Sequence, residues 1–266
     1  DRLPALRLLA YAAGTVKAVV PDELWARGVA VSSAAAANAV PVAEFTFAAI
    51  VMIAKDVIRV RDAYRANRGE GWVSGVGPAG PLGTHGLKVG VIGASKIGRL
   101  VLERLRTLDV KLGLRDPYLD PEEVDELGAT PMGLDELCSW SDIVTVHAPE
   151  LTATRHMIDA ERLALMRDGA WLINTARGSI VDTAALEAEC ASGRLAAWID
   201  TPDPEPLPPT SPLWDLPNAV LTPHIAGSMG NEAERMGLLA AGEVGRFLSG
   251  RPLNHEVRAG DLGLLA

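Results

Sequence analysis

The chain has little cysteine, and its two cysteines show no functional spacing. Cys138 and Cys190 lie far apart, with no Cys-x-x-Cys pair and no cluster of metal-ligand residues around either. A disulfide framework and a metal site are therefore not expected, and a reducing cytoplasm is the compartment that fits best.

The chain also lacks an excess of positive charge. Its 266 residues carry a formal net charge of −9 at pH 7. Proteins that bind nucleic acid usually present a clustered basic surface, so a nucleic-acid partner is not expected.

Long apolar runs are missing as well. The longest, from Phe45 to Ala54, is interrupted by Thr46 and ends at Lys55. A membrane-spanning helix needs about 20 apolar residues, so we predict a buried helix here and no membrane partner. The first residues, Asp1 to Pro4, have neither an initiator Met nor the basic-then-apolar layout of a signal peptide, which predicts a chain that begins in mid-domain.

The first part of the chain predicts a small βαβ fragment followed by a long helix. Short apolar runs at residues 6–10 and 29–32 flank a helix that starts at Pro21. A helical pattern then runs from Pro41 towards Asn67. Residues 69–86 are rich in Gly and Pro and are expected to form a connecting loop.

Beyond that loop, short apolar runs alternate with segments of helix length. The runs are residues 87–92, 110–114, 143–146, 170–173, 195–199 and 219–221. This alternation predicts an α/β fold with a doubly wound parallel sheet covered on both faces. Residues 202–212 hold six prolines and predict a stiff loop, and residues 231–249 predict a final amphipathic helix.

A glycine turn follows the first of these strands. In a Gly-x-Gly-x-x-Gly turn, the first Gly permits the tight turn and the second lets the backbone approach a pyrophosphate. The third allows the helix and strand to pack closely. Here the three positions are Gly93, Ser95 and Gly98, and residues 96–108 form the predicted helix. The context favours a dinucleotide site over an ordinary strand–helix turn.

Asp116 supports this interpretation. It comes 18 positions after Gly98, at the end of the next predicted strand. An acidic group about 20 residues beyond the turn bonds the ribose 2′-hydroxyl and repels a 2′-phosphate, so we predict NAD rather than NADP. The alternative is a turn-forming Asp ahead of Pro117.

Three residues downstream suggest acid–base chemistry on a carboxylate substrate. Arg177 follows a predicted strand, and its guanidinium can bind a carboxylate bidentately, although it could also be an ordinary ion-pairing Arg. His224 lies at another strand end, where an imidazole can exchange a proton near neutral pH. Glu205, on the proline-rich loop, can orient that imidazole, the alternative being a solvated carboxylate.

The sequence blocks around these residues resemble the D-isomer-specific 2-hydroxyacid dehydrogenases. The blocks are residues 174–178, 199–200, 205–208 and 216–224, and the resemblance extends from Leu6 to Val257. It implies a Rossmann NAD-binding domain over residues 44–226. A second, smaller flavodoxin-like substrate domain would comprise residues 1–43 and 227–266 and be incomplete at its N-terminus.

The resemblance also implies residue roles. Arg177 would bind the substrate carboxylate, His224 would be the acid/base and Glu205 its partner, while Gly14 and Thr15 would contact the substrate. The expected cofactor-binding residues are Gly93, Ser95, Lys96, Ile97, Gly98, Asp116, His147, Ala148, Pro149, Thr175, Ala176, Asp200 and Gly227. Asp200 would lie beside the nicotinamide, and His147 would be a cofactor-side residue rather than a proton donor.

The implied reaction is reversible hydride transfer between NADH and a small 2-oxo acid, in a homodimer that associates through the cofactor domain. Two departures stand out: Ser95 replaces the family's usual Gly, and the turn at Gly14 is less glycine-rich. The main alternative is a non-enzymatic, NAD-responsive interaction protein resembling corepressors that keep this fold. Formate dehydrogenase relatives pair the histidine with Gln, so Glu205 argues against them.

Overall fold

The computed structural model describes residues 3–17, 19–68 and 83–262, so most of the expected loop at residues 69–86 lies outside the described residues. The chain divides into two compact units. Unit 1 comprises Asp1–Val42 with Gly227–Ala266, and unit 2 comprises Ala43–Ala226.

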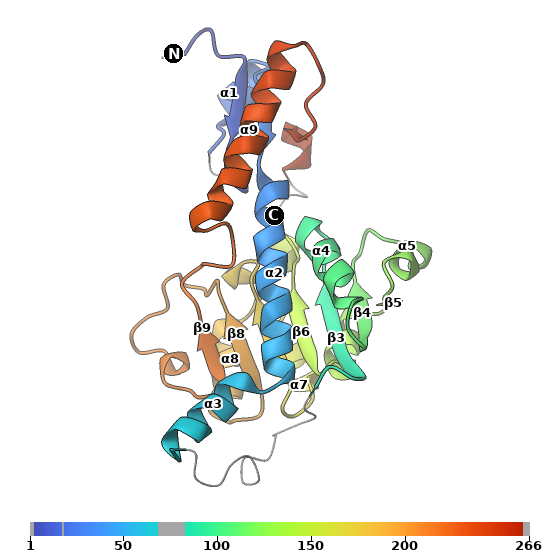
Figure 1. Ribbon diagram of the computed structural model, residues 1–266, viewed down its shortest axis with the longest axis vertical. Coiled ribbons are helices and arrows are strands. Elements are labelled where there is room, and N and C mark those ends of the chain that lie inside the picture. Colours follow the sequence, from blue (N-terminus) through green and yellow to red (C-terminus); the bar gives the residue numbers. More distant parts are fainter. Residues whose placement is uncertain (1–2, 18, 69–82, 263–266) are drawn as a thin grey trace. The chain divides into compact units, whose positions relative to one another are not determined.

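Unit 2 is built on a seven-stranded, entirely parallel sheet (Figure 1). Its strands are β3 (Leu87–Ile92), β4 (Val110–Arg115), β5 (Thr130–Pro131), β6 (Ile143–Val146), β7 (Trp171–Asn174), β8 (Ala196–Ile199) and β9 (Ala219–Leu221). Their order in the sheet is β5-β4-β3-β6-β7-β8-β9, so the chain moves outwards from β3 in one direction and then returns to continue from β6 in the other. The predicted α/β fold and parallel sheet are confirmed. Among the strands of this sheet, sequence reasoning missed only the two-residue, exposed β5.

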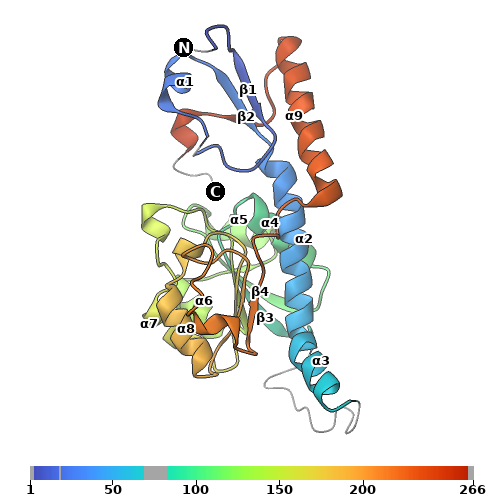
Figure 2. The same cartoon turned by 90° about the vertical axis from the view of Figure 1, so that its left-hand side faces the viewer.

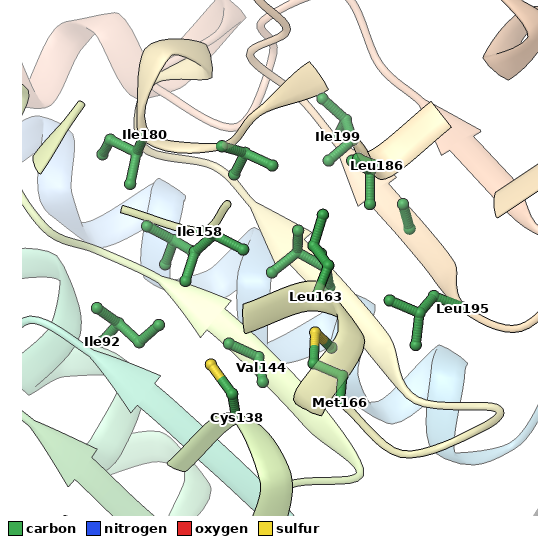
Figure 3. Packing of buried hydrophobic residues seen from close by; sticks show 14 of the residues in the cluster. Ile92, Cys138, Val144, Ile158, Leu163, Met166, Ile180, Leu186, Leu195 and Ile199 are labelled. Carbon is green, nitrogen blue, oxygen red and sulfur yellow. The ribbon is translucent and has the colours of Figure 1, made fainter. Parts of the chain in front are cut away.

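Helices cover both faces of this sheet (Figure 2). They are α4 (Lys96–Leu105), α5 (Pro121–Glu126), α6 (Leu134–Trp140), α7 (Ala160–Leu165) and α8 (Thr183–Ala191), together with part of α2 (Ala35–Ala54). One core cluster lies between the sheet and α6, α7 and α8 (Figure 3), and another joins the sheet to α2, α4 and α5. Successive strand residues serve different clusters: Ile143 belongs to the second and Val144 to the first. Burying one such side chain contributes about 1.5–3 kcal/mol, which is why both faces of the strands are apolar.

The long helix differs from the prediction at both ends. It begins at Ala35, whose backbone N–H donates to the hydroxyl of Ser33 at 3.0 Å, and Pro41 lies inside it. It ends at Ala54, and a separate helix α3 (Val57–Ala66) follows. The break occurs at Asp56, whose φ of 52° is in the left-handed region and cannot continue an α-helix. The predicted single helix from Pro41 was therefore wrong.

The prediction from run length also underestimated this helix. α2 has 20 residues and is long and apolar enough, by length and composition alone, to cross a membrane. The core helix of a globular protein passes the same test, and α2 buries Ala43, Ala49, Ile50 and Ala54 in the second core cluster of unit 2. The burial of these four residues agrees with the prediction of a buried helix.

Unit 1 contains a three-stranded sheet in the order β1-β2-β10. Its elements are β1 (Leu8–Tyr11), α1 (Asp22–Ala26), β2 (Ala30–Ser33), α9 (Ala233–Leu248) and β10 (Glu256–Val257). β1 and β2 are parallel, which confirms the βαβ fragment, and β10 joins them antiparallel. The buried carboxylate of Glu243 in α9 accepts hydrogen bonds from the backbone N–H groups of Asn254 and His255, and so holds the segment that leads into β10.

Candidate functional site

The candidate residues of unit 2 gather at the carboxyl ends of neighbouring strands. Gly93 follows β3, Asp116 follows β4, His147 follows β6, Thr175 follows β7 and Asp200 follows β8. These strands are adjacent and parallel, so their carboxyl ends share one edge of the sheet. Ligands of open α/β sheets bind at this edge, where the strand order reverses.

The glycine turn brings backbone segments unusually close together. Gly93 has φ of 92°, and a Cβ atom there would lie 2.8 Å from the backbone nitrogen of Ala148. A Cβ atom at Gly98 would lie 1.9 Å from the carbonyl oxygen of Gly93. Neither position can accept a side chain without moving backbone, so both glycines are required by the shape of the turn.

Ser95 is the N-cap of α4. Its backbone is extended, with φ of −61° and ψ of 179°, and its hydroxyl accepts a hydrogen bond from Gly98 N–H at 3.3 Å. The side chain is thus directed at the first turn of the helix. The first N–H groups of a helix have no intrahelical acceptor, so those of Lys96 and Ile97 suit an anion, which the helix dipole also favours. The turn therefore fits the pyrophosphate of a dinucleotide despite the missing second glycine.

Asp116 forms the local turn considered from the sequence and also holds the glycine turn. Its Oδ2 accepts a hydrogen bond from Ala94 N–H at 2.7 Å, which ties β4 to the glycine turn. Its Oδ1 accepts one from Tyr118 N–H at 2.9 Å, which forms a local turn. Each carboxylate oxygen retains a second lone pair, so the fixed group can still accept a ribose hydroxyl.

His147 is buried beneath the glycine turn. Its Nε2 lies 2.9 Å from the hydroxyl of Thr145, its Nδ1 has no partner among the described residues, and only 1% of the residue is exposed. Burial lowers the pKa of His147 to about 3, so the imidazole is neutral at physiological pH. Next to it, Ala148 is buried and Pro149 accepts a hydrogen bond at its carbonyl from the hydroxyl of Thr154.

The loop after β7 is fixed around Arg177. The side-chain oxygen of Asn174 accepts from Ala176 N–H at 3.0 Å, and its amide nitrogen donates to the carbonyl oxygen of Arg177 at 2.9 Å. A Cβ atom at Gly178 would lie 2.2 Å from the carbonyl oxygen of Pro202, so this loop packs directly on the one that follows β8. The guanidinium of Arg177 donates one hydrogen bond to the carbonyl oxygen of Ala176, at 2.6 Å. An arginine has five N–H donors, which leaves enough for a carboxylate.

Asp200 organises the loop that carries His224. It is fully buried, and its carboxylate accepts hydrogen bonds from the hydroxyl of Thr222 and from the N–H groups of Ile225 and Ala226, at 2.6, 2.9 and 3.0 Å. Its backbone carbonyl accepts from His224 N–H at 3.0 Å. These contacts hold His224 at a φ of 53°, a left-handed conformation that costs a non-glycine residue energy. The sequence analysis expected a nicotinamide contact for Asp200 and did not anticipate this set of bonds.

The structure brings His224 and Glu205 together. The Nδ1 atom of His224 lies 2.8 Å from Oε1 of Glu205, and both side chains are about half exposed, at 48% and 47%. A carboxylate at Nδ1 fixes the ring orientation, so Nε2 is the atom left to exchange a proton with a ligand. The sequence suggested that Glu205 could orient His224 but could not show their contact.

The remaining candidates, Gly14, Thr15 and Gly227, belong to unit 1. Asn38 of α2 joins two of them: a Cβ atom at Gly227 would lie 3.2 Å from its Oδ1, and one at Gly14 would lie 3.7 Å from its Nδ2. Asn38 also accepts a hydrogen bond from Ser228 N–H at 2.8 Å. Sequence reasoning missed Asn38, whose only signal was an amide within an apolar helix.

Residues 47–226 match the model of the D-isomer specific 2-hydroxyacid dehydrogenase family, NAD binding domain. The chain belongs to this family. The match covers almost all of unit 2, so that unit is the NAD-binding domain of the family, and its cofactor is NAD.

Curated members of the family are similar over most of this chain. It is 34% identical over 261 residues to a glyoxylate reductase of Thermofilum pendens, covering 94% of this chain and 74% of the relative. It is 33% identical over 260 residues to a D-3-phosphoglycerate dehydrogenase of Mycobacterium tuberculosis, covering 97% of this chain and 48% of the relative. The chain therefore spans about half the length of the phosphoglycerate dehydrogenases that it matches.

The chain is also similar to a solved structure. The D-lactate dehydrogenase from Aquifex aeolicus, in complex with NAD and lactic acid, aligns with a TM-score of 0.74 and 29% identity. The alignment covers 94% of this chain and 78% of that one.

Proposed function

We propose that this protein catalyses reversible hydride transfer between NADH and a small 2-oxo acid, with a D-2-hydroxy acid as the reduced product. The observation that carries the proposal is the 2.8 Å contact between His224 and Glu205. It gives a family NAD-binding domain an imidazole that is held by a carboxylate and accessible to solvent.

Each of the three polar residues has a distinct task in this reaction. Arg177 binds the substrate carboxylate, because its planar guanidinium matches the two oxygens. His224 donates a proton from Nε2 to the ketone oxygen in reduction and removes it in oxidation. Glu205 accepts a hydrogen bond from Nδ1 and stabilises the imidazolium. When bound, NADH supplies the hydride that reaches the carbonyl carbon.

Asp200 supports the acid/base rather than touching the reacting atoms. Its carboxylate and carbonyl hold residues 222–226, which keeps His224 at the edge of the sheet. Asp116 and the turn from Gly93 to Gly98 bind the adenosine and pyrophosphate side of the cofactor, and Thr175 and Ala176 line its path towards the nicotinamide.

We further propose that unit 1 is the substrate domain and that Gly14 and Thr15 contribute to substrate binding. The names of the relatives suggest the range of substrates: a glyoxylate reductase, a D-3-phosphoglycerate dehydrogenase and a D-lactate dehydrogenase crystallised with lactic acid. All of these names refer to 2-hydroxy or 2-oxo acids.

The test is NADH oxidation, followed by absorbance, with glyoxylate, hydroxypyruvate, pyruvate and phosphohydroxypyruvate as candidate substrates. We expect turnover on at least one acid and its loss in His224→Ala. A wild-type chain that binds NADH but reduces none of a broad panel of 2-oxo acids would contradict the proposal and favour the NAD-responsive interaction protein.

We also propose a cytoplasmic homodimer that binds neither nucleic acid nor membranes. Supporting features are the acidic net charge, the two unpaired buried cysteines, and the side chains of Phe45, Phe47 and Met52 on α2, which pack against the core but remain partly exposed and could extend into a contact with a second copy. Light scattering coupled to size exclusion should give twice the mass of the chain. A monomer at micromolar concentration would exclude the dimer.

A further inference from the structure

A buried hydroxyl pair connects α2 to the loop that carries Arg177. The Oγ1 atoms of Thr46 and Thr175 lie 3.0 Å apart, and either can donate. Thr46 is fully buried and Thr175 is 5% exposed, although they are 129 positions apart in the chain. Buried hydroxyls are costly unless they are hydrogen-bonded, so each needs the other.

The hydrogen bond from Thr46 holds the side chain of Thr175, a part of the loop that the side chain of Asn174 does not hold. Asn174 holds the backbone of Ala176 and Arg177 through its side-chain amide. Thr175 lies between Asn174 and these anchored groups, and its side chain is held by Thr46 from a different element. The backbone on either side of Thr175 and the side chain of Thr175 are thus fixed by separate contacts.

Packing alone does not explain a threonine at position 46. α2 buries Ala43, Ala49 and Ile50 in an apolar core, where a valine would have the same shape as Thr46 and no hydroxyl to desolvate. The hydrogen bond with Thr175, on the loop that carries Arg177, gives a reason for a hydroxyl at position 46.

We propose that Thr46 is a positioning residue that acts through Thr175 to hold the loop of residues 174–178 in its binding conformation. The effect of Thr46 on catalysis rests on the proposed function, whereas its effect on the loop and on NADH binding does not. Thr46 touches neither substrate nor cofactor in this role, and its effect should fall on binding more than on the chemical step.

The experiment compares Thr46→Val, which keeps the shape and removes the hydroxyl, with Thr46→Ser, which keeps the hydroxyl. Ser141→Ala is the matched control: Ser141 is also fully buried, its hydroxyl donates to the carbonyl oxygen of Leu137, and it precedes β6 at the opposite edge of the sheet. The readouts are the Kd for NADH, KM and kcat with the best 2-oxo acid, and hydrogen exchange of the peptide spanning residues 174–180.

We expect Thr46→Val to raise the Kd for NADH and the KM for the acid by about two- to tenfold, the effect of losing one hydrogen bond, with a smaller change in kcat. Amide exchange in residues 174–178 should accelerate in Thr46→Val. Thr46→Ser should stay close to wild type in all of these measurements. Ser141→Ala should change only the melting temperature.

Equal behaviour of Thr46→Val and Thr46→Ser would overturn the proposal, as would a Thr46→Val variant that differs from wild type only in melting temperature. If the wild-type chain binds NADH without turning over any acid, the proposed function fails, yet NADH affinity and hydrogen exchange still decide the role of Thr46. Combining Thr46→Val with Thr175→Val should cost less than the sum of the two single changes, because both remove the same bond.

Discussion

Two histidines at the carboxyl edge of the same sheet lie in opposite environments. His147, beyond β6, is buried under the glycine turn with a pKa lowered to about 3. His224, beyond β9, is half exposed and hydrogen-bonded to Glu205. The residue type and its place at a strand end are shared, so neither assigns a function. Solvent access and a carboxylate partner make one imidazole suitable for proton exchange and leave the other a neutral packing group.

The largest expected difference is in turnover. His224→Gln removes the proton donor and should lower kcat by about 10²–10⁴-fold while leaving the Kd for NADH near wild type. The same change at His147 removes only a hydrogen bond with Thr145 and should alter kcat by at most about two- to tenfold. Steady-state kinetics of both variants test this. A His147→Gln variant that is as inactive as His224→Gln would show that the two histidines do not differ in their importance for turnover.

Glu205 should account for part of the advantage of His224. In Glu205→Gln the amide oxygen can still accept from Nδ1, but it no longer stabilises the imidazolium, so we expect kcat to fall by about 10²-fold. Glu256→Gln is a suitable control, because Glu256 is another exposed glutamate, paired with Arg258 in unit 1. If both substitutions leave kcat unchanged, Glu205 is only a loop carboxylate.

His147 should instead affect the free energy of unfolding at acidic pH. In the unfolded chain His147 binds a proton below its ordinary pKa near 6.5, whereas in the folded protein it stays neutral down to about pH 3. The unfolded state therefore takes up the extra proton, and the free energy of unfolding falls as the pH falls between these values. The contribution of this residue is about 1.4 kcal/mol per pH unit.

Urea unfolding of wild type and His147→Gln at pH 7, 6, 5 and 4 should therefore show a shallower loss of stability in the variant. His85→Gln serves as the control, because His85 is almost fully exposed and bonded to Asp109 on the surface. If the free energy of unfolding falls equally with pH in wild type and His147→Gln, His147 takes up its proton in the folded state as well over this pH range.

Burial should also make the thiols of Cys138 and Cys190 unreactive, and this is the smallest effect that we predict. Burial raises the pKa of Cys138 to about 11 and that of Cys190 to about 12. The reactive thiolate is therefore scarce, and modification by a disulfide reagent at pH 8 should be on the order of 10²-fold slower in the folded protein than in urea. Fast labelling of native protein would show that these core positions open frequently.

Features that depend on local steric rules were predictable from the sequence, and long-range contacts were not. Doubly buried strands need continuous apolar runs, which is why β3 and β6 begin and end where the sequence analysis placed them. Gly93 and Gly98 were recognisable because a tight turn excludes side chains there. β5 was missed because two exposed residues leave no apolar pattern.

The site shows the same limit. Arg177, Glu205 and His224 could be named from their motifs, but the bonds that position them join residues far apart in the chain. Examples are Thr46 with Thr175 and Asp200 with the backbone after His224. The start of α2 depended on a cap from Ser33 and its end on the left-handed Asp56, and neither feature leaves a periodic signal.

The close approach of Gly178 to Pro202 has a consequence for engineering this protein. Since a Cβ atom at position 178 would meet the backbone of the next loop at 2.2 Å, the segments that carry Arg177 and Glu205 behave as interlocking parts. A loop transplanted from a relative to alter substrate scope at residues 202–208 should function only when residues 174–178 are exchanged with it. The smallest transferable module of this site is therefore the pair of loops.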